Sequence, residues 1–129
     1  MRSQAREIVF QYLFSKLFNQ GDEGLFDVLA KDLSNDDKVF AKNLLNAVID
    51  NETVFGNTLK KLSENFRFER IFAADRCAIY IGMAELSVLK DAPYAVAIDE
   101  AVKLAVKFST EKSSDYVNGI LAEYAKSLT

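Results

Sequence analysis

Apolar residues recur along this chain in steps of three and four, which is the period of an α-helix. The alternation typical of strands is nowhere sustained, and Pro93 is the only proline, so the pattern predicts an all-α protein. The first predicted helix follows Ser3 as its N-cap and runs to about Phe18. Because Phe10, Phe14 and Phe18 add a second apolar stripe, this helix is expected either to lie deep in the core or to present one face to a partner.

The middle of the chain predicts helices on both sides of Ser34. A short helix covers about 25–33, and Ser34 with the acid Asp37 three residues later has the pattern of a capping box. The helix that Ser34 opens is expected to be interrupted at Asn51 and to resume up to about Ser63. The pattern fits one kinked helix or two helices here.

The most apolar helix is predicted after a short aromatic segment, 66–71. Proline excludes the preceding residue from the helical region, so Asp91-Ala92-Pro93 should end this helix. Its inner-face candidates are Cys77, Ala78, Ile81, Met83, Leu86 and Leu89.

Two amphipathic helices are expected to complete the fold. The first runs from Val96 to Phe108, with Asp99 and Lys103 four residues apart on its outer side, a spacing that favours an ion pair. After a loop, Ser113 or Ser114 is expected to cap the last helix.

Size and composition narrow the class of protein. A chain of 129 residues with 50% hydrophobic and 27% charged residues is typical of one soluble globular domain. The longest uncharged runs are too short to span a membrane, and the first residues lack the apolar stretch of a secretory signal. We therefore expect a cytoplasmic protein without membrane association.

The chain is poor in the residues that most enzymes use. It has no histidine, and Cys77 is its only cysteine, so we expect no metal site, no cofactor, no catalytic residue and no internal disulfide. Cys77 is expected to be a buried structural thiol in a reducing compartment.

The charges are unevenly distributed along the chain. The net charge of −3 argues against indiscriminate coating of nucleic acid. Residues 1–20 carry three cations and one acid, and residues 60–76 carry five cations and three acids, whereas residues 21–59 hold eight acids and three lysines. Any surface that binds an anion must therefore be local.

Several residue groups follow one another along the chain. No single group is decisive, but their ordered combination is specific, and it resembles the NusB family. Residues 19–65 match the family only in their helical pattern. The groups that carry the resemblance are Ala5-Arg6-Glu7 with Gln11 and Leu13-Phe14, Phe68-Glu69-Arg70-Ile71, Asp75-Arg76, Glu85-Leu86, Pro93, Ala97-Ile98, Glu100-Ala101-Val102, Leu104-Ala105, Lys107-Phe108 and Val117-Asn118-Gly119-Ile120-Leu121.

The resemblance implies a fold and a function. The fold would be a NusB-like bundle of about six or seven helices in one domain, 1–129, with two helical subdomains at approximately 1–65 and 66–129. The function would be to bind boxA-type single-stranded RNA together with the ribosomal protein NusE, in an RNA polymerase antitermination complex that supports transcription of ribosomal RNA operons. Some family members form homodimers, and the extra aromatic surface of the first helix permits one here.

The sequence also departs from the family pattern, at positions that concern RNA affinity and not the fold. A start that is often arginine-rich retains only Arg2 and Arg6. The thin supply of cations favours a second hypothesis, a protein-only scaffold that has lost most RNA affinity. A third is the noncatalytic RNA-binding subunit of an RNA methyltransferase. The remaining departures are Tyr80, Asp99, Asp115 and Tyr116.

Two groups of residues are candidates for RNA binding, because cations hold phosphates while aromatic and polar side chains stack on or hydrogen-bond to splayed bases. We expect apolar helix faces to bring the two groups together into one groove. Each group also has an ordinary structural interpretation. The first can be a solvated start of a helix, and the Tyr116 ring of the second can be a core residue. The first group is Arg2, Ser3, Gln4 and Arg6, and the second is Lys112, Ser113, Tyr116 and Asn118.

Under the resemblance, Phe14, Asp75 and Arg76 are the candidates for the surface that faces NusE. The competing interpretation of Asp75 and Arg76 is an exposed ion pair that contributes little. Glu85, inside the most apolar helix, is expected to be a structural carboxylate held by hydrogen bonds. Gly119 in mid-helix is locally unfavourable, and close backbone packing is its expected explanation.

Overall fold

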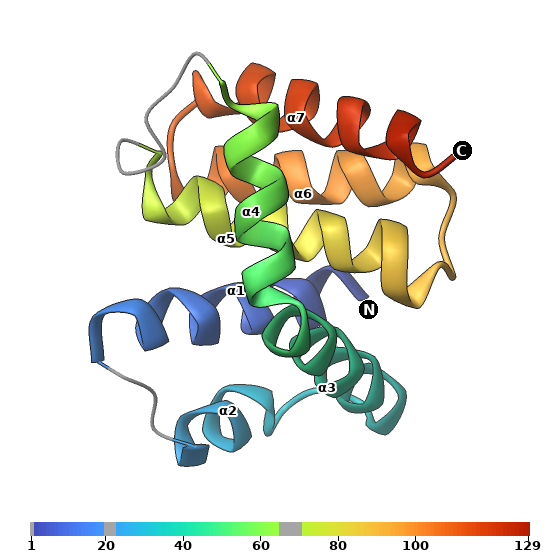
Figure 1. Cartoon of the computed structure of the whole chain (residues 1–129). Helices are drawn as coiled ribbons and strands as arrows, with labels where there is room; N and C mark the ends of the chain where they lie inside the picture. Colours follow the sequence, from blue (N-terminus) through green and yellow to red (C-terminus); the bar gives the residue numbers. More distant parts are fainter. Residues whose placement is uncertain (1, 20–22, 65–70) are drawn as a thin grey trace.

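The computed structural model describes residues 2–19, 23–64 and 71–129, which form a bundle of helices without strands (Figure 1). The predicted all-α class is therefore confirmed. Most of the predicted segment 66–71 lies outside the described residues. In chain order the elements are α1 (Arg2–Asn19), α2 (Glu23–Ala30), α3 (Asn35–Asp50), α4 (Glu52–Leu62), α5 (Ala73–Ala84), the π-helical turn η2 (Glu85–Leu89), α6 (Tyr94–Phe108) and α7 (Ser113–Ser127).

Helix α1 packs against α2, α3, α5 and α6, so it contacts helices from both halves of the chain. The side chains of Ala5 and Val9 are fully buried, and Phe10 stacks on Phe108 of α6 with ring centroids 4.6 Å apart. Burying apolar side chains of this size contributes roughly 1.5 to 3 kcal/mol each. The buried residues of all the helices form one core cluster. The two predicted subdomains thus share that core.

The predicted N-cap at Ser34 is confirmed, and the break at Asn51 separates two helices. The Ser34 hydroxyl accepts a hydrogen bond from the backbone N–H of Asp37 at 3.2 Å. Asn51 ends α3, and its side-chain amide donates to the carbonyl of Ala47 at 2.8 Å. Helix α4 then leaves in a clearly different direction (Figure 1), which resolves the choice between one kinked helix and two.

The most apolar predicted helix begins as α5 and ends as the π-helical turn η2. In this turn the backbone N–H of Lys90 bonds to the carbonyl of Glu85 at 3.0 Å. Lys90 adopts a left-handed conformation with φ 54°, which stops the helix just before the predicted end at Pro93. Cys77 is buried as expected.

Helix α5 also allows α7 to approach closely at Gly82. A Cβ atom at Gly82 would lie 2.5 Å from a side-chain carbon of Leu121. Any larger residue at position 82 would force the Leu121 side chain to move, so glycine favours this close contact between the two helices.

Helix α6 begins at Tyr94, two residues earlier than predicted, and its outer pair of Asp99 and Lys103 is confirmed at 3.2 Å. The predicted cap of α7 by Ser113 or Ser114 is wrong. Ser113 is the first residue of α7, and its backbone N–H donates to the Thr110 hydroxyl at 3.2 Å. The Ser113 hydroxyl is thereby available for a contact elsewhere.

Among the described residues, none of the helices is both long and apolar enough to cross a membrane.

Candidate functional site

The N-terminal candidate group begins at Arg2, which lies on the surface between α3 and the start of α6. Its guanidinium is 3.1 Å from an Asp91 carboxylate oxygen and 4.5 Å from the centre of the Phe40 ring. Ser3 donates a hydrogen bond to the Glu100 carboxylate at 3.1 Å. The exposed side chains of this group are therefore oriented by acidic residues of the second half of the chain. Gln4 is also exposed.

Arg6 belongs to the interior and not to that surface. Its guanidinium donates two hydrogen bonds to the Glu85 carboxylate, at 2.7 and 2.8 Å, and lies 3.6 Å from Glu100. The side chains of Arg6 and Glu85 are only 4% and 0% exposed. The placement of Arg6 at a phosphate-binding surface is therefore corrected, because both of its hydrogen-bonding edges are already occupied or buried.

The buried pair satisfies the expectation for Glu85, which is a structural carboxylate held by hydrogen bonds. Burial of Arg6 would by itself lower its pKa. The hydrogen bond to Glu85 and the charges of Glu85, Glu100 and Asp91 outweigh the burial and raise the pKa of Arg6 above its ordinary value. The arginine therefore stays charged under all conditions in which the protein is folded.

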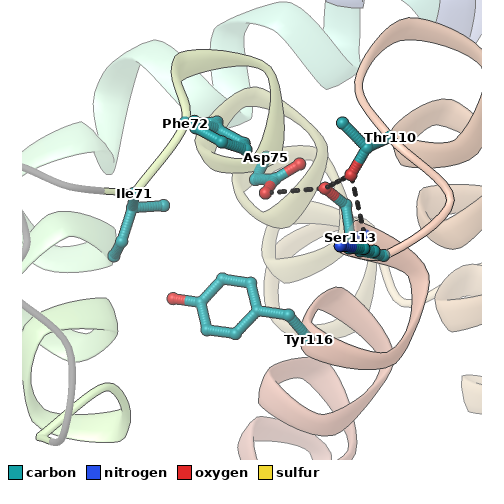
Figure 2. A pocket seen from close by; sticks show the side chains of 7 residues that line it. Ile71, Phe72, Asp75, Thr110, Ser113 and Tyr116 are labelled. Atoms are coloured by element: carbon teal, nitrogen blue, oxygen red, sulfur yellow. Dashed lines mark hydrogen bonds between the residues drawn. The ribbon is translucent and has the colours of Figure 1, made fainter.

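Three of the four residues of the second candidate group line a pocket of about 340 Å³ at the corner where α6 leads into α7 (Figure 2). Lys112, Ser113 and Tyr116 come from this corner, and the N-terminal end of α5 provides the opposite wall. Phe72 lies in that wall with 60% of its side chain exposed. The pocket thus combines a cation, a phenol and an accessible aromatic ring, which are groups that hold nucleotides.

Asp75 is at the polar centre of this pocket. It is 5% exposed, and one carboxylate oxygen accepts a hydrogen bond from the Ser113 hydroxyl at 3.0 Å (Figure 2). The other oxygen is buried and has no hydrogen-bond partner among the described residues. An exposed ion pair is therefore the wrong interpretation of Asp75. Its free oxygen leaves an acceptor for a hydrogen-bond donor that enters the pocket.

Tyr116 is half-buried, and its hydroxyl forms a hydrogen bond of 2.7 Å with Ser63. Burial raises the pKa of the Tyr116 phenol, although the bond to Ser63 opposes this effect. The hydroxyl is therefore neutral at physiological pH, and one edge of the ring faces the pocket.

Asn118 and Gly119 lie on the outer face of α7, where both are exposed. A Cβ atom at Gly119 would meet nothing within 4 Å. The expected explanation of Gly119 by close packing is therefore wrong. The exposed position of Asn118 is compatible with a polar contact to a ligand.

The partner-surface candidates lie on α1 and α5. The Phe14 ring is 36% exposed and stacks on Phe10 with centroids 6.0 Å apart. Arg76 is half-buried and lines a hollow of about 260 Å³ together with Lys16, Leu17 and Tyr80. Leu17 is 44% exposed. Arg76 therefore lies beside an exposed apolar end of α1, and a partner that binds there can bury this end of the helix.

The structure does not bring the two RNA candidate groups into direct contact. Arg2 is paired with Asp91, just before α6 begins, whereas Lys112 follows the end of α6. Helix α6 contains 15 residues, so at about 1.5 Å per residue its ends are about 22 Å apart. A ligand that touches both groups must extend along α6.

Some residues of the site were not singled out from the sequence. Phe72 directly follows the aromatic segment 66–71 and was not part of it, and Thr110 has no distinguishing sequence signal. Lys107 pairs with Glu7 of α1 and is 60% exposed, so it lies between the two candidate groups. Lys107 could have been found from the sequence, because its spacing along the helix places it on the outer face of α6.

The described residues contain no group of three or more histidine, cysteine, aspartate or glutamate side chains placed to hold a metal ion.

The chain matches known proteins over nearly its full length. The model of the NusB family matches residues 3–126. The transcription antitermination protein NusB of Natranaerobius thermophilus is 33% identical over 133 residues, with 98% of this chain and 96% of that protein covered. The protein of the same name from Methylacidiphilum infernorum is 31% identical, with 97% and 90% covered.

Solved structures show the same fold. T. maritima NusB has a TM-score of 0.90 and 29% identity, with 98% of this chain and 91% of that chain covered. A crystal structure of the antitermination factors NusB and NusE in complex with dsRNA contains a chain with a TM-score of 0.86 and 26% identity, with 98% and 96% covered. With a matching family model and a curated relative above 30% identity, this chain belongs to the NusB family of transcription antitermination proteins.

Proposed function

We propose that this protein binds boxA-type single-stranded RNA together with the ribosomal protein NusE, within an RNA polymerase antitermination complex that supports transcription of ribosomal RNA operons. Family membership supports a noncatalytic role in antitermination. The observation that carries the proposal is the pocket at the α6–α7 corner, which combines Lys112 and Tyr116 with the exposed ring of Phe72. We place this activity in the cytoplasm.

The RNA strand is proposed to run along α6 between the two candidate groups. Arg2, Ser3 and Gln4 would contact it at one end, and Lys112 and Tyr116 at the other. Lys107 lies between them with 60% of its side chain exposed. Three or four phosphate contacts predict a slope of log K against log salt of about −2 to −3.

The second RNA group includes two further residues with different roles. Ser113 is buried and engaged by Asp75, so it shapes the pocket and does not face the solvent. Asn118 is exposed and available for a hydrogen bond to a base.

NusE is proposed to bind the surface formed by Phe14, Leu17 and Arg76. Asp75 is buried and lines the α6–α7 pocket, so it is not part of this surface. The exposed side chains of Phe14 and Leu17 supply the hydrophobic contact that a protein interface needs at its centre. The same surface permits a homodimer, which would compete with NusE. Sedimentation with and without NusE distinguishes the two states.

The test is a fluorescence-anisotropy titration of boxA RNA and of a scrambled RNA, each with and without NusE. Lys112→Ala should weaken RNA binding and make the salt slope shallower, whereas Lys126→Ala, an exposed lysine at the far end of α7, should change neither. A titration in which boxA and scrambled RNA bind equally, with and without NusE, would refute the proposal.

Tyr116→Ala should cost roughly 1 to 3 kcal/mol of RNA binding free energy if the ring stacks on a base. Tyr116→Phe is the matched control, because it keeps the ring and removes only the hydroxyl that bonds to Ser63. Equal loss in the two variants would assign the effect to the Ser63 contact and not to stacking.

A protein-only scaffold is the second candidate function. One observation favours it: with Arg6 held in the interior by Glu85, Arg2 is the only arginine of the N-terminal group that remains at the surface. In that case NusE would still bind while the RNA titration stayed flat.

A further inference from the structure

The groove between α2 and α3 is separate from both candidate groups. It has a volume of about 460 Å³, and most of its lining is apolar, with Phe26 and Val39 among the lining residues. The Val39 side chain is 61% exposed. An exposed apolar groove of this kind marks a surface that can bury part of another molecule.

Three lysines line this groove: Lys31 directly after α2, and Lys38 and Lys42 from α3. They are the only cations among the eleven charged residues from 21 to 59, so folding gathers every positive charge of that acidic segment at one place. Within the part of the chain that the structure describes, none of the three forms an ion pair. The lysines are therefore available to carboxylates from outside.

We propose that this groove binds an acidic segment of a partner protein that carries one apolar anchor residue. The anchor would contact the exposed Val39 and the edge of Phe26 that lines the groove, and carboxylates on the same face of the segment would pair with the lysines. Lys38 and Lys42 are four residues apart on one helix, so they are neighbours on its surface. A helical segment with two glutamates four residues apart matches that spacing.

RNA fits this groove less well than an acidic peptide does. The Phe26 ring is only 7% exposed, and the Lys42 ammonium already lies 5.3 Å from its centre, so no base can stack on it. The surrounding segment is also acidic overall, which opposes a polyanion more than it opposes a short peptide with two carboxylates.

The test uses two labelled helical peptides as probes, each with a central leucine. One has glutamates three and seven residues after the leucine, so that all three side chains lie on one face of the helix, and the other has lysines at those positions. Titration into the full-length protein should show binding of the acidic peptide alone. In Lys38→Glu/Lys42→Glu, two attractions become repulsions, so affinity for the acidic peptide should fall about tenfold, while the lysine peptide should gain affinity.

The matched control is Lys61→Glu/Lys126→Glu, which makes the same change of net charge at exposed positions outside the groove. It should leave the affinity for the acidic peptide within about twofold of the unmodified protein. Equal losses in both double variants, equal binding of the two peptides, or no binding of the acidic peptide would overturn the proposal. Far-UV circular dichroism of both variants checks that they are folded.

A parallel boxA titration of the groove variant separates this inference from the proposed function. We expect its RNA affinity to be unchanged. A loss of RNA affinity without a loss of peptide affinity would assign the groove to RNA and overturn the inference. Failure of the proposed function would instead show in the titration of the unmodified protein.

Discussion

The buried pair of Arg6 and Glu85 offers a strong test of how this fold is held together. The two residues are 79 positions apart and join α1 to the end of α5 through two hydrogen bonds of 2.7 and 2.8 Å. We consider Arg6→Met, which replaces the charged side chain with an apolar one of similar length, and Glu85→Gln, which keeps the shape of the carboxylate. Both changes remove the charge with little change of packing.

Arg6→Met leaves an unpaired carboxylate at a position that is 0% exposed, a change that typically costs about 3 to 5 kcal/mol. A domain of this size has a total stability of roughly 5 to 15 kcal/mol, so the loss is a large fraction of the whole. Glu85→Gln should cost less, because Arg6 keeps the carboxylate of Glu100 at 3.6 Å. The double variant should be more stable than Arg6→Met, since it has no unpaired charge.

Urea unfolding followed by circular dichroism measures these differences from the midpoints at constant m-value. Two results would refute the reasoning: a loss below about 1 kcal/mol in Arg6→Met, or a double variant that is no more stable than Arg6→Met.

Three further predictions concern stability and reactivity. Gly82→Ala should lower the free energy of unfolding by about 1 to 3 kcal/mol, because its methyl group would lie 2.5 Å from a leucine side-chain carbon of α7. Gly119→Ala should raise it by about 0.5 to 1 kcal/mol, because its methyl group would enter open space. Equal shifts of the thermal unfolding temperature in the two variants would contradict this prediction. Burial raises the pKa of the Cys77 thiol to about 12, so at pH 8 the thiol stays protonated and should react with iodoacetamide only after urea is added; rapid labelling of the folded protein would show that it is accessible. Ser113→Ala removes the bond to the buried carboxylate of Asp75 and should cost about 1 to 3 kcal/mol, and an unchanged urea midpoint would mean that water replaces the hydroxyl.

The features that the sequence predicted well are those set by neighbours along the chain. The Ser34 cap and the break at Asn51 depend on backbone groups within four residues, so their signals are local. The pair of Asp99 and Lys103 is one helical turn apart and needs no knowledge of the fold. The helical period predicted buried positions of α5 such as Cys77 and Ile81, but it reports one face of a helix. Because α5 is buried on most sides, Ile79 and Ala84 were missed.

The features that the sequence did not predict depend on distant segments. Arg6 belongs to the same helix start as the exposed Arg2, and only the packing of Glu85 against α1 decides that Arg6 is buried. The role of Ser113 was mistaken for the same reason: its hydroxyl does not cap α7 but bonds to Asp75, 38 positions away. Tertiary contacts overrode the local preference in both cases.

The position of α1 has a consequence for how the chain is made. Ser3, Arg6 and Glu7 contact residues 97, 79 and 100 positions further on. A ribosome adds about 5 to 20 residues per second, so the first helix waits several seconds for these contacts, and longer until they leave the exit tunnel. During that time its apolar stripes are uncovered, and a nascent-chain chaperone has its best opportunity to bind there.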